Sequence, residues 1–160
     1  MRELSLFSGA GGGLLASKYL LEWETLGYVE FNEYCQKIIS QRIKDGLLDE
    51  APIFTNIQAF NREGYAESYQ GMVDVISGGF PCQDISSAGQ CKGIEGERSG
   101  LWKEMAYTIR KVRPKYAFIE NSPMLTIRGL NVVLYDLAEM GFDAKWGVLG
   151  AHHFGGSIPR

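Results

Sequence analysis

The sequence lacks several features that would place it in common classes of protein. No apolar run approaches the roughly 20 residues that a membrane-spanning helix needs. The first residues contain no apolar core of a signal peptide, so we expect a cytoplasmic protein. Three cysteines, an odd number, argue against a disulfide framework. A net charge of −3 argues against nucleic-acid binding through bulk positive charge alone.

Glycine, in contrast, is in excess. Twenty of the 160 residues are glycine, against an average near 7%. They gather in short clusters without a fixed period, which excludes collagen-like and low-complexity sequences. With 45% hydrophobic residues, the chain has the length and composition of one domain, 1–160, that buries a core.

Short apolar runs alternate with segments of helical periodicity. The pattern predicts strands over 4–7, 25–30, 53–54, 72–77, 116–120 and 145–149. It predicts helices over 14–21, 33–44, 100–112 and 131–140, and a long loop over 78–99. Strands separated by helices of about ten residues indicate βαβ units. We therefore predict an α/β fold with a doubly wound, mostly parallel sheet.

Three predicted strand ends carry unusual residues. A glycine-rich turn follows the first strand, Pro81-Cys82 follows the fourth, and Glu120-Asn121 closes the fifth. Because ligands bind beyond the carboxyl ends of the strands in such sheets, we expect these groups to converge on one crevice. This convergence is the central prediction from the pattern.

The glycine turn, residues 8–13, predicts a cofactor site. Gly9 and Gly11 permit positive φ and close approach of a ligand to the backbone. A dinucleotide fingerprint would need glycine where Leu14 stands, so that match is partial. Glu30 ends the second strand near the spacing at which an acid holds ribose hydroxyls. Together they predict a nucleoside cofactor without a pyrophosphate, which S-adenosylmethionine fits. The alternative is a tight turn and a surface glutamate.

Cys82 and Glu120 are the candidate reactive side chains. Cys82 lies in a polar loop after an apolar strand, where nearby N–H groups would lower its pKa and favour the nucleophilic thiolate. Glu120 is a candidate proton donor or hydrogen-bond anchor. A structural thiol is the alternative for Cys82, but its Gly-Gly-Phe-Pro flank and the acid on a neighbouring strand favour a nucleophile.

The remaining cysteines and the two histidines give weaker signals. Cys35 belongs to a helical pattern and is expected to be packed, and Cys91 has no partner at metal-ligand spacing, so no zinc site is predicted. His152 and His153 could assist Cys82 in a cysteine hydrolase, or they could be surface residues.

Together these residues resemble the cytosine-C5 DNA methyltransferases, in order and along essentially the whole chain. The resembling segments are Leu6–Gly12, Glu30-Phe31, Gly79–Gln83, Arg98–Trp102, Glu120-Asn121 and Phe154-Gly155. Gly79–Gln83, which is similar to the family's catalytic loop, is the most specific of them. The resemblance implies a Rossmann-like, S-adenosylmethionine-dependent methyltransferase fold.

The resemblance also implies a reaction, methyl transfer to C5 of cytosine. Cys82 would attack C6 of the base, Glu120 would hold N3 and the amino group, and Pro81 would shape the loop. Arg160 matches the first arginine of a later motif. Loss of the C5 proton and elimination of Cys82 would complete the cycle.

A set of cofactor contacts follows from the same resemblance. Phe7 would stack on S-adenosylmethionine, and the family's aspartate for the adenine amino group is replaced by Asn56, whose amide oxygen would accept the same bond. The implied set is Phe7, Ser8, Gly9, Gly11, Glu30, Phe31, Asn56, Ile57 and Leu101.

The implied substrate is double-stranded DNA with its target base flipped out, at a cost of a few kcal/mol. Residues 83–98, with Lys92 and Arg98, would close over the DNA or simply carry solvated charges. Ser122 stands where the family usually has valine. Relative to the family, the target-recognition domain and two closing motifs are absent. We therefore expect a complementing subunit that carries the positively charged, DNA-reading part.

Two further alternatives stay open besides the hydrolase. The chain could be a non-catalytic remnant that binds a partner, because the family's closing motifs are missing. Its substrate could also be RNA, since a branch that methylates transfer RNA resembles the same motifs.

Overall fold

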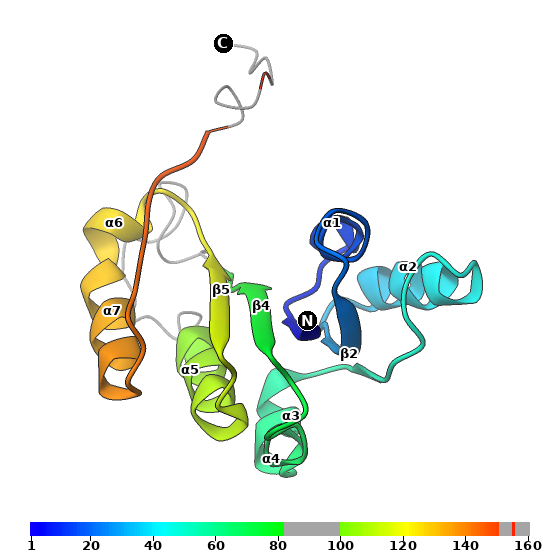
Figure 1. Ribbon diagram of the computed structural model, residues 1–160, viewed down its shortest axis with the longest axis horizontal. Coiled ribbons are helices and arrows are strands. Elements are labelled where there is room, and N and C mark those ends of the chain that lie inside the picture. The colour runs from blue at the N-terminus through cyan, green and yellow to red at the C-terminus, as the bar shows by residue number, and fades with distance from the viewer. Residues whose placement is uncertain (82–99, 151–154, 156–160) are drawn as a thin grey trace.

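A parallel five-stranded sheet forms the centre of the computed structural model, which describes residues 1–81, 100–150 and 155 (Figure 1). The strand order is β3-β2-β1-β4-β5, and the described pairs are all parallel. The strands are β1 (Arg2–Leu6), β2 (Glu24–Val29), β3 (Ile53–Phe54), β4 (Val75–Gly79) and β5 (Tyr116–Glu120). The prediction of a mostly parallel α/β fold is confirmed.

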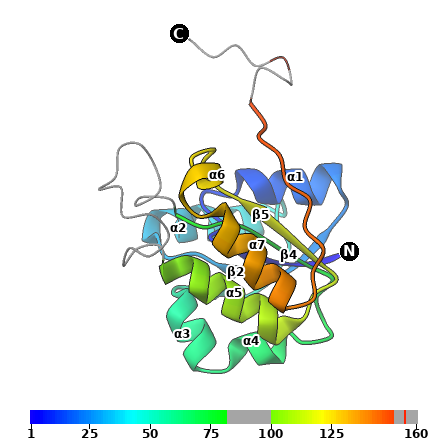
Figure 2. The same ribbon diagram turned by 90° about the vertical axis from the view of Figure 1, so that its left-hand side faces the viewer.

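Helices cover both faces of the sheet, as the views in Figures 1 and 2 show. They are α1 (Gly12–Leu20), α2 (Glu33–Lys44), α3 (Ile57–Arg62), α4 (Tyr65–Ser68), α5 (Gly100–Val112), α6 (Leu125–Arg128) and α7 (Leu130–Glu139). Helices α1 and α2 pack on one face, and the others contribute to the core on the opposite face. No helix in these described ranges is long and apolar enough to cross a membrane.

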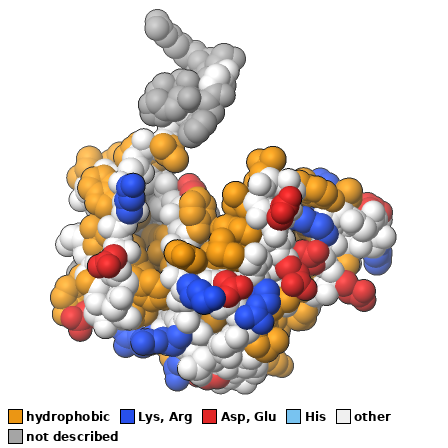
Figure 3. Space-filling view, in the orientation of Figure 1, with side chains coloured by type: hydrophobic (Ala, Val, Ile, Leu, Met, Phe, Trp, Pro, Cys, Tyr) orange, Lys and Arg blue, Asp and Glu red, His pale blue; other side chains and the backbone are white. Residues whose placement is uncertain are grey.

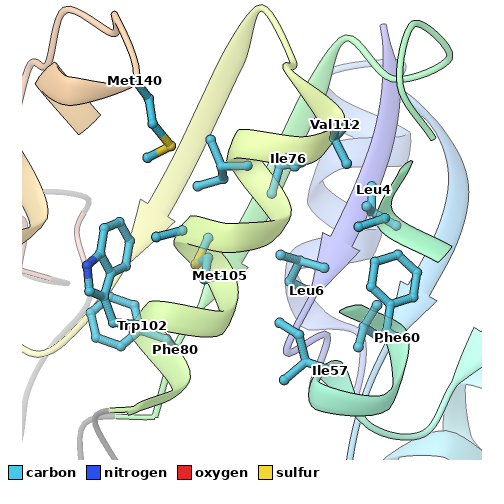
Figure 4. Packing of buried hydrophobic residues seen from close by; sticks show 14 of the residues in the cluster. Leu4, Leu6, Ile57, Phe60, Ile76, Phe80, Trp102, Met105, Val112 and Met140 are labelled. Atoms are coloured by element: carbon cyan, nitrogen blue, oxygen red, sulfur yellow. The ribbon is translucent and has the colours of Figure 1, made fainter. Parts of the chain in front are cut away.

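The larger core lies between the sheet and α3, α5 and α7 (Figure 4). Leu4 and Leu6 of β1 and Ile76 of β4 are fully buried there, because central parallel strands are covered on both faces. Helix α5 presents Trp102, Met105, Ile109 and Val112 at spacings of three and four residues, so one apolar stripe faces the sheet. The smaller core joins α1, β2 and α2 through Leu14, Tyr28, Ile39 and Leu48.

The structure departs from the sequence prediction in several elements. The predicted strand over 145–149 is wrong, because this segment has no regular secondary structure. It borders a cavity of about 390 Å³ shared with β5 and α7 instead of pairing with β5. The short helices α3, α4 and α6 were not predicted. Strand β4 begins three residues later than expected and continues through Gly79, and Cys35 is half-buried.

Asp74, which directly precedes β4, connects the beginnings of the two strands on either side of it, β1 and β5. Its carboxylate accepts a hydrogen bond from the backbone N–H of Arg2 at 2.9 Å and pairs with Lys115 Nζ at 3.1 Å. The Arg2 N–H, and then Lys115, lower the pKa of Asp74 from 3.8 to about 2. This carboxylate therefore stabilises the fold in its charged form, at the edge of the sheet opposite to the strand ends that carry the candidate site.

We predict that Asp74 makes stability acid-sensitive. Because its pKa is lowered on folding, its contribution is fully present above about pH 4 and is lost as the pH falls toward 2. Urea unfolding between pH 2 and 6 should show a smaller acid-dependent loss for Asp74→Asn than for the wild type. Asp143→Asn, at an exposed carboxylate outside this network, should follow the wild type. Identical pH slopes for Asp74→Asn and the wild type would contradict the assignment.

Candidate active site

The turn after β1 leaves the sheet through an unusual backbone conformation. Phe7 has φ of +52°, in the left-handed region where bulky side chains are rare. Gly9 follows at +58°, and a Cβ at Gly9 would meet no atom within 4 Å. Ser8 anchors the turn, because its hydroxyl donates to the backbone carbonyl of Ser5 at 3.2 Å. The turn therefore presents open backbone at the carboxyl end of β1.

Glu30 joins this turn to the end of β2. Only 8% of Glu30 is exposed, and its Oε2 accepts a hydrogen bond from the Gly9 N–H at 2.6 Å. Its Oε1 accepts from the Asn32 N–H at 2.7 Å. Gln36 of α2 holds the same segment, since its Nε2 donates to the backbone carbonyls of Glu30 at 2.8 Å and Phe31 at 3.2 Å. Gln36 was not predicted as a site residue, because it carries no motif signal of its own.

The chemistry around Glu30 fits a nucleoside. Each carboxylate oxygen has a second lone pair that can accept from a ribose hydroxyl. Phe31 directly follows and is 78% exposed, so its ring offers a flat apolar surface beside the acid. The open glycine backbone at Gly9 leaves space for a ligand on the other side. These features suit the cofactor that the sequence predicted.

Asn56 lies after β3, where the backbone N–H of Glu30 donates to the Phe54 carbonyl at 2.9 Å. Its Oδ1 caps α3 by accepting from Gln58 N at 2.7 Å and Ala59 N at 3.1 Å. Both lone pairs of the amide oxygen are thus engaged in capping α3. The expected acceptor atom is already occupied.

Ile57 and Leu101 offer a ligand little side-chain surface. Ile57 is 5% exposed and belongs to the larger core, so its backbone N–H is the group available at the start of α3. Leu101 is half-buried in the first turn of α5 and packs against the same core. Their roles in cofactor binding stay predictions.

A cavity of about 440 Å³ joins the first strand end to the last (Figure 3). Phe7 and Ser8 from the β1 turn, Gly79 from β4 and Glu120 from β5 all border it. The cavity lies on the α1 side of the sheet, where Leu21 and Phe118 add apolar walls. Of the groups predicted to converge, the turn after β1 and Glu120 share this cavity, whereas Pro81 and Asn121 are not among its lining residues and Cys82 lies outside the described residues.

The floor of this cavity contains a buried acid, Glu3 of β1. Glu3 is 1% exposed and accepts hydrogen bonds from the hydroxyls of Ser17, Thr25 and Ser77. These donors come from α1, β2 and β4. The carboxylate therefore links three elements around β1 through three protein donors, which indicates a role in holding the fold together.

The ends of β4 and β5 are bonded to each other. Asn121 Nδ2 donates to the Phe80 carbonyl at 2.9 Å, and the Ser122 N–H fixes the amide by donating to Asn121 Oδ1 at 2.8 Å. Phe80 is 2% exposed and its ring lies 5.4 Å from that of Trp102 (Figure 4). The half-buried Pro81 continues from this anchored residue.

Several candidate residues lie outside the described residues. They are Cys82, Cys91, Lys92, Arg98, His152, His153 and Arg160. Glu120 is described and exposed at the cavity wall. The described ranges contain no group of three or more His, Cys, Asp or Glu side chains that could hold a metal ion.

Comparisons with known proteins identify the family of the chain. The family model of C-5 cytosine-specific DNA methylases matches residues 1–160. Type II methyltransferase M.CviJI of Paramecium bursaria Chlorella virus IL3A is 33% identical over 159 residues, covering 95% of this chain and 40% of that protein. Type II methyltransferase M.Sau3AI of Staphylococcus aureus is 27% identical, covering 100% of this chain and 41% of that protein.

A solved structure supports the same fold. A crystal structure of a Spodoptera frugiperda DNMT2 mutant matches with a TM-score of 0.64 and 21% identity, over 87% of this chain and 41% of that one. The chain spans about 40% of the length of the curated relatives M.CviJI and M.Sau3AI. Because the family match extends over all 160 residues, the chain belongs to the C-5 cytosine-specific DNA methylase family.

Proposed function

We propose that this chain is the cofactor-binding and catalytic part of a DNA (cytosine-5)-methyltransferase that uses S-adenosylmethionine. The observation that carries the proposal is the single cavity bordered by Phe7 and Ser8 at one end and Glu120 at the other. A methyl donor and a cytosine must meet in one space. Phe7 and Ser8, proposed for the cofactor, and Glu120, proposed for the base, border this cavity, whereas Glu30 and Phe31 lie outside its lining. The family assignment favours methyl transfer over the cysteine-hydrolase alternative.

S-adenosylmethionine supplies a methyl group on a positively charged sulfur. Glu30 binds the ribose, Phe31 stacks beside the base, and Phe7 lies against the cofactor from the turn. The backbone N–H groups of Gly9 and Asn32 hold the Glu30 carboxylate in place before the ligand binds. This preorganisation removes part of the ordering cost of binding.

In the proposed reaction the Cys82 thiolate forms a bond from sulfur to C6 of cytosine. Glu120 holds N3 and the amino group, so that the electron pair displaced from C6 is stabilised and C5 becomes nucleophilic. C5 would then take the methyl group that S-adenosylmethionine supplies, leaving S-adenosylhomocysteine. Loss of the C5 proton to a solvent base would restore the C5–C6 double bond and expel the Cys82 thiolate. Pro81 fixes the direction in which the chain reaches Cys82, and Arg160 supplies a positive charge to the site.

DNA recognition is assigned to polypeptide beyond these 160 residues. The chain has a net charge of −3, while binding to the phosphate backbone depends on clustered lysine and arginine. We therefore propose that a complementing segment or subunit carries the target-recognition function. The proposed substrate is double-stranded DNA, and the proposed location is the cytoplasm.

We predict that Glu30 determines cofactor affinity. Glu30→Ala removes the carboxylate that accepts these hydrogen bonds. It should weaken S-adenosylmethionine binding about 10- to 100-fold, as measured by calorimetry. Glu33→Ala, at a nearby acid that is exposed on α2 and pairs with Lys37, is the matched control and should bind normally. No heat of binding and no thermal shift for the wild type would instead support the non-catalytic remnant.

Asn56→Asp is predicted to strengthen cofactor binding. Aspartate still caps α3, and its carboxylate has lone pairs left to accept from the adenine amino group after capping. We expect a several-fold lower Kd for S-adenosylmethionine with unchanged thermal stability. Asn56→Ser, which keeps a capping oxygen but adds no carboxylate, should not show the gain. Equal affinities for Asn56→Asp and the wild type would place the adenine away from this residue.

Methyl transfer itself is predicted to require Cys82. The assay mixes this chain with the part of M.CviJI that it does not match, labelled S-adenosylmethionine, and either duplex DNA or transfer RNA. Transfer to DNA should be abolished in Cys82→Ala and lowered about 10²- to 10⁴-fold in Glu120→Gln. Activity that survives Cys82→Ala would refute the nucleophile, and preferential labelling of transfer RNA would replace DNA as substrate.

A further inference from the structure

We propose that Gly79 is a positioning residue for Glu120. The missing side chain at position 79 leaves the space that the Glu120 carboxylate occupies at the cavity wall. The importance of that placement for methyl transfer rests on the function proposed above. The geometry of the two residues is independent of that function.

The space at Gly79 is filled by the carboxylate itself. A Cβ built on Gly79 would lie 2.5 Å from Glu120 Oε2 and 3.6 Å from its Cδ. Contacts of a real Cβ below 3.0 Å essentially never occur. The two groups therefore cannot coexist in their present positions.

Backbone conformation does not explain this glycine. Gly79 is not among the residues with positive φ, so alanine can adopt the same backbone without left-handed strain. It is the last residue of a regular strand, where glycine is disfavoured by its conformational entropy. Glycine is needed at position 79 because the Glu120 side chain occupies the space that a methyl group would fill.

The backbones on both sides are held, so the Glu120 side chain is the part that must move. Gly79 and Glu120 are register partners in the ladder of β4 and β5. One residue further on, the bond from Asn121 Nδ2 to the Phe80 carbonyl ties the two strand ends together. In the described part of the chain, no hydrogen bond is recorded to the Glu120 carboxylate. A methyl group at position 79 thus displaces the end of a flexible side chain and leaves the sheet intact.

The adjacent glycine provides a natural contrast. A Cβ on Gly78 would lie 2.6 Å from the backbone carbonyl oxygen of Leu6, and Leu6 is fully buried in β1. This obstacle belongs to the sheet and cannot swing away. Gly78 therefore serves the packing of β4 on β1, whereas Gly79 serves the placement of an acid.

The test compares Gly79→Ala with Gly78→Ala and with Gly147→Ala, whose added Cβ would meet no atom within 4 Å. Thermal unfolding should show a large loss for Gly78→Ala and wild-type midpoints for the other two. In NMR spectra of the whole chain, the Glu120 ¹³Cδ resonance and side-chain couplings should change in Gly79→Ala and remain unchanged in Gly147→Ala.

The functional readout is the methyl-transfer assay described for Cys82. Gly79→Ala should lower kcat about 10- to 100-fold with an unchanged KM for S-adenosylmethionine. Adding Glu120→Gln to Gly79→Ala should cost much less than it does in the wild type, because both changes act on one carboxylate.

Distinct outcomes overturn the two proposals. An unmoved Glu120 side chain in Gly79→Ala, or a loss of stability as large as that of Gly78→Ala, overturns the positioning role. A moved side chain with wild-type kcat also overturns it. A wild-type assay without any methyl transfer counts against the proposed function, and the NMR comparison still decides whether Gly79 places the carboxylate.

Discussion

The parallel register of the central strands is the constraint on which the site depends. Leu6 at the end of β1 pairs with Val29 on one side and Gly78 on the other, and Gly79 pairs with Glu120. Because the strands end level with one another, the residues that follow them meet at one edge of the sheet. Groups far apart in the sequence thereby border one cavity without any long loop having to position them.

Much of this arrangement could be read from the sequence. Helices 33–44 and 100–112 and strand 116–120 were predicted with their observed bounds, because apolar spacing, an aspartate-glycine stop and Pro114 define them. The helices α3, α4 and α6 are too short for periodicity to reveal them. The segment 145–149 has the apolar pattern of a strand, but a strand forms only where a partner accepts its hydrogen bonds, and here it faces a cavity beside β5.

Residue types at the site were easier to predict than the atoms they leave free. The sequence placed Glu30 at the end of a strand and the resemblance pointed to Asn56, yet neither could show that Asn56 Oδ1 is used by α3. Such competition between side chain and backbone depends on local geometry that spacing does not encode. Cys82 lies outside the described residues, so its placement stays a prediction. The close approach of the Glu120 carboxylate to Gly79 is a feature of the three-dimensional structure that the sequence does not reveal.

The left-handed backbone at Phe7 has a thermodynamic consequence. Holding a bulky residue in this region costs ~1–3 kcal/mol, and the ring is half-buried against the larger core, which fixes it there. Folding has therefore already fixed the position of the aromatic ring that the proposed function places against the cofactor. The strained backbone lowers the free energy of unfolding of the domain. In return, the fixed ring loses less conformational entropy when a ligand binds, so part of the binding affinity is determined by folding.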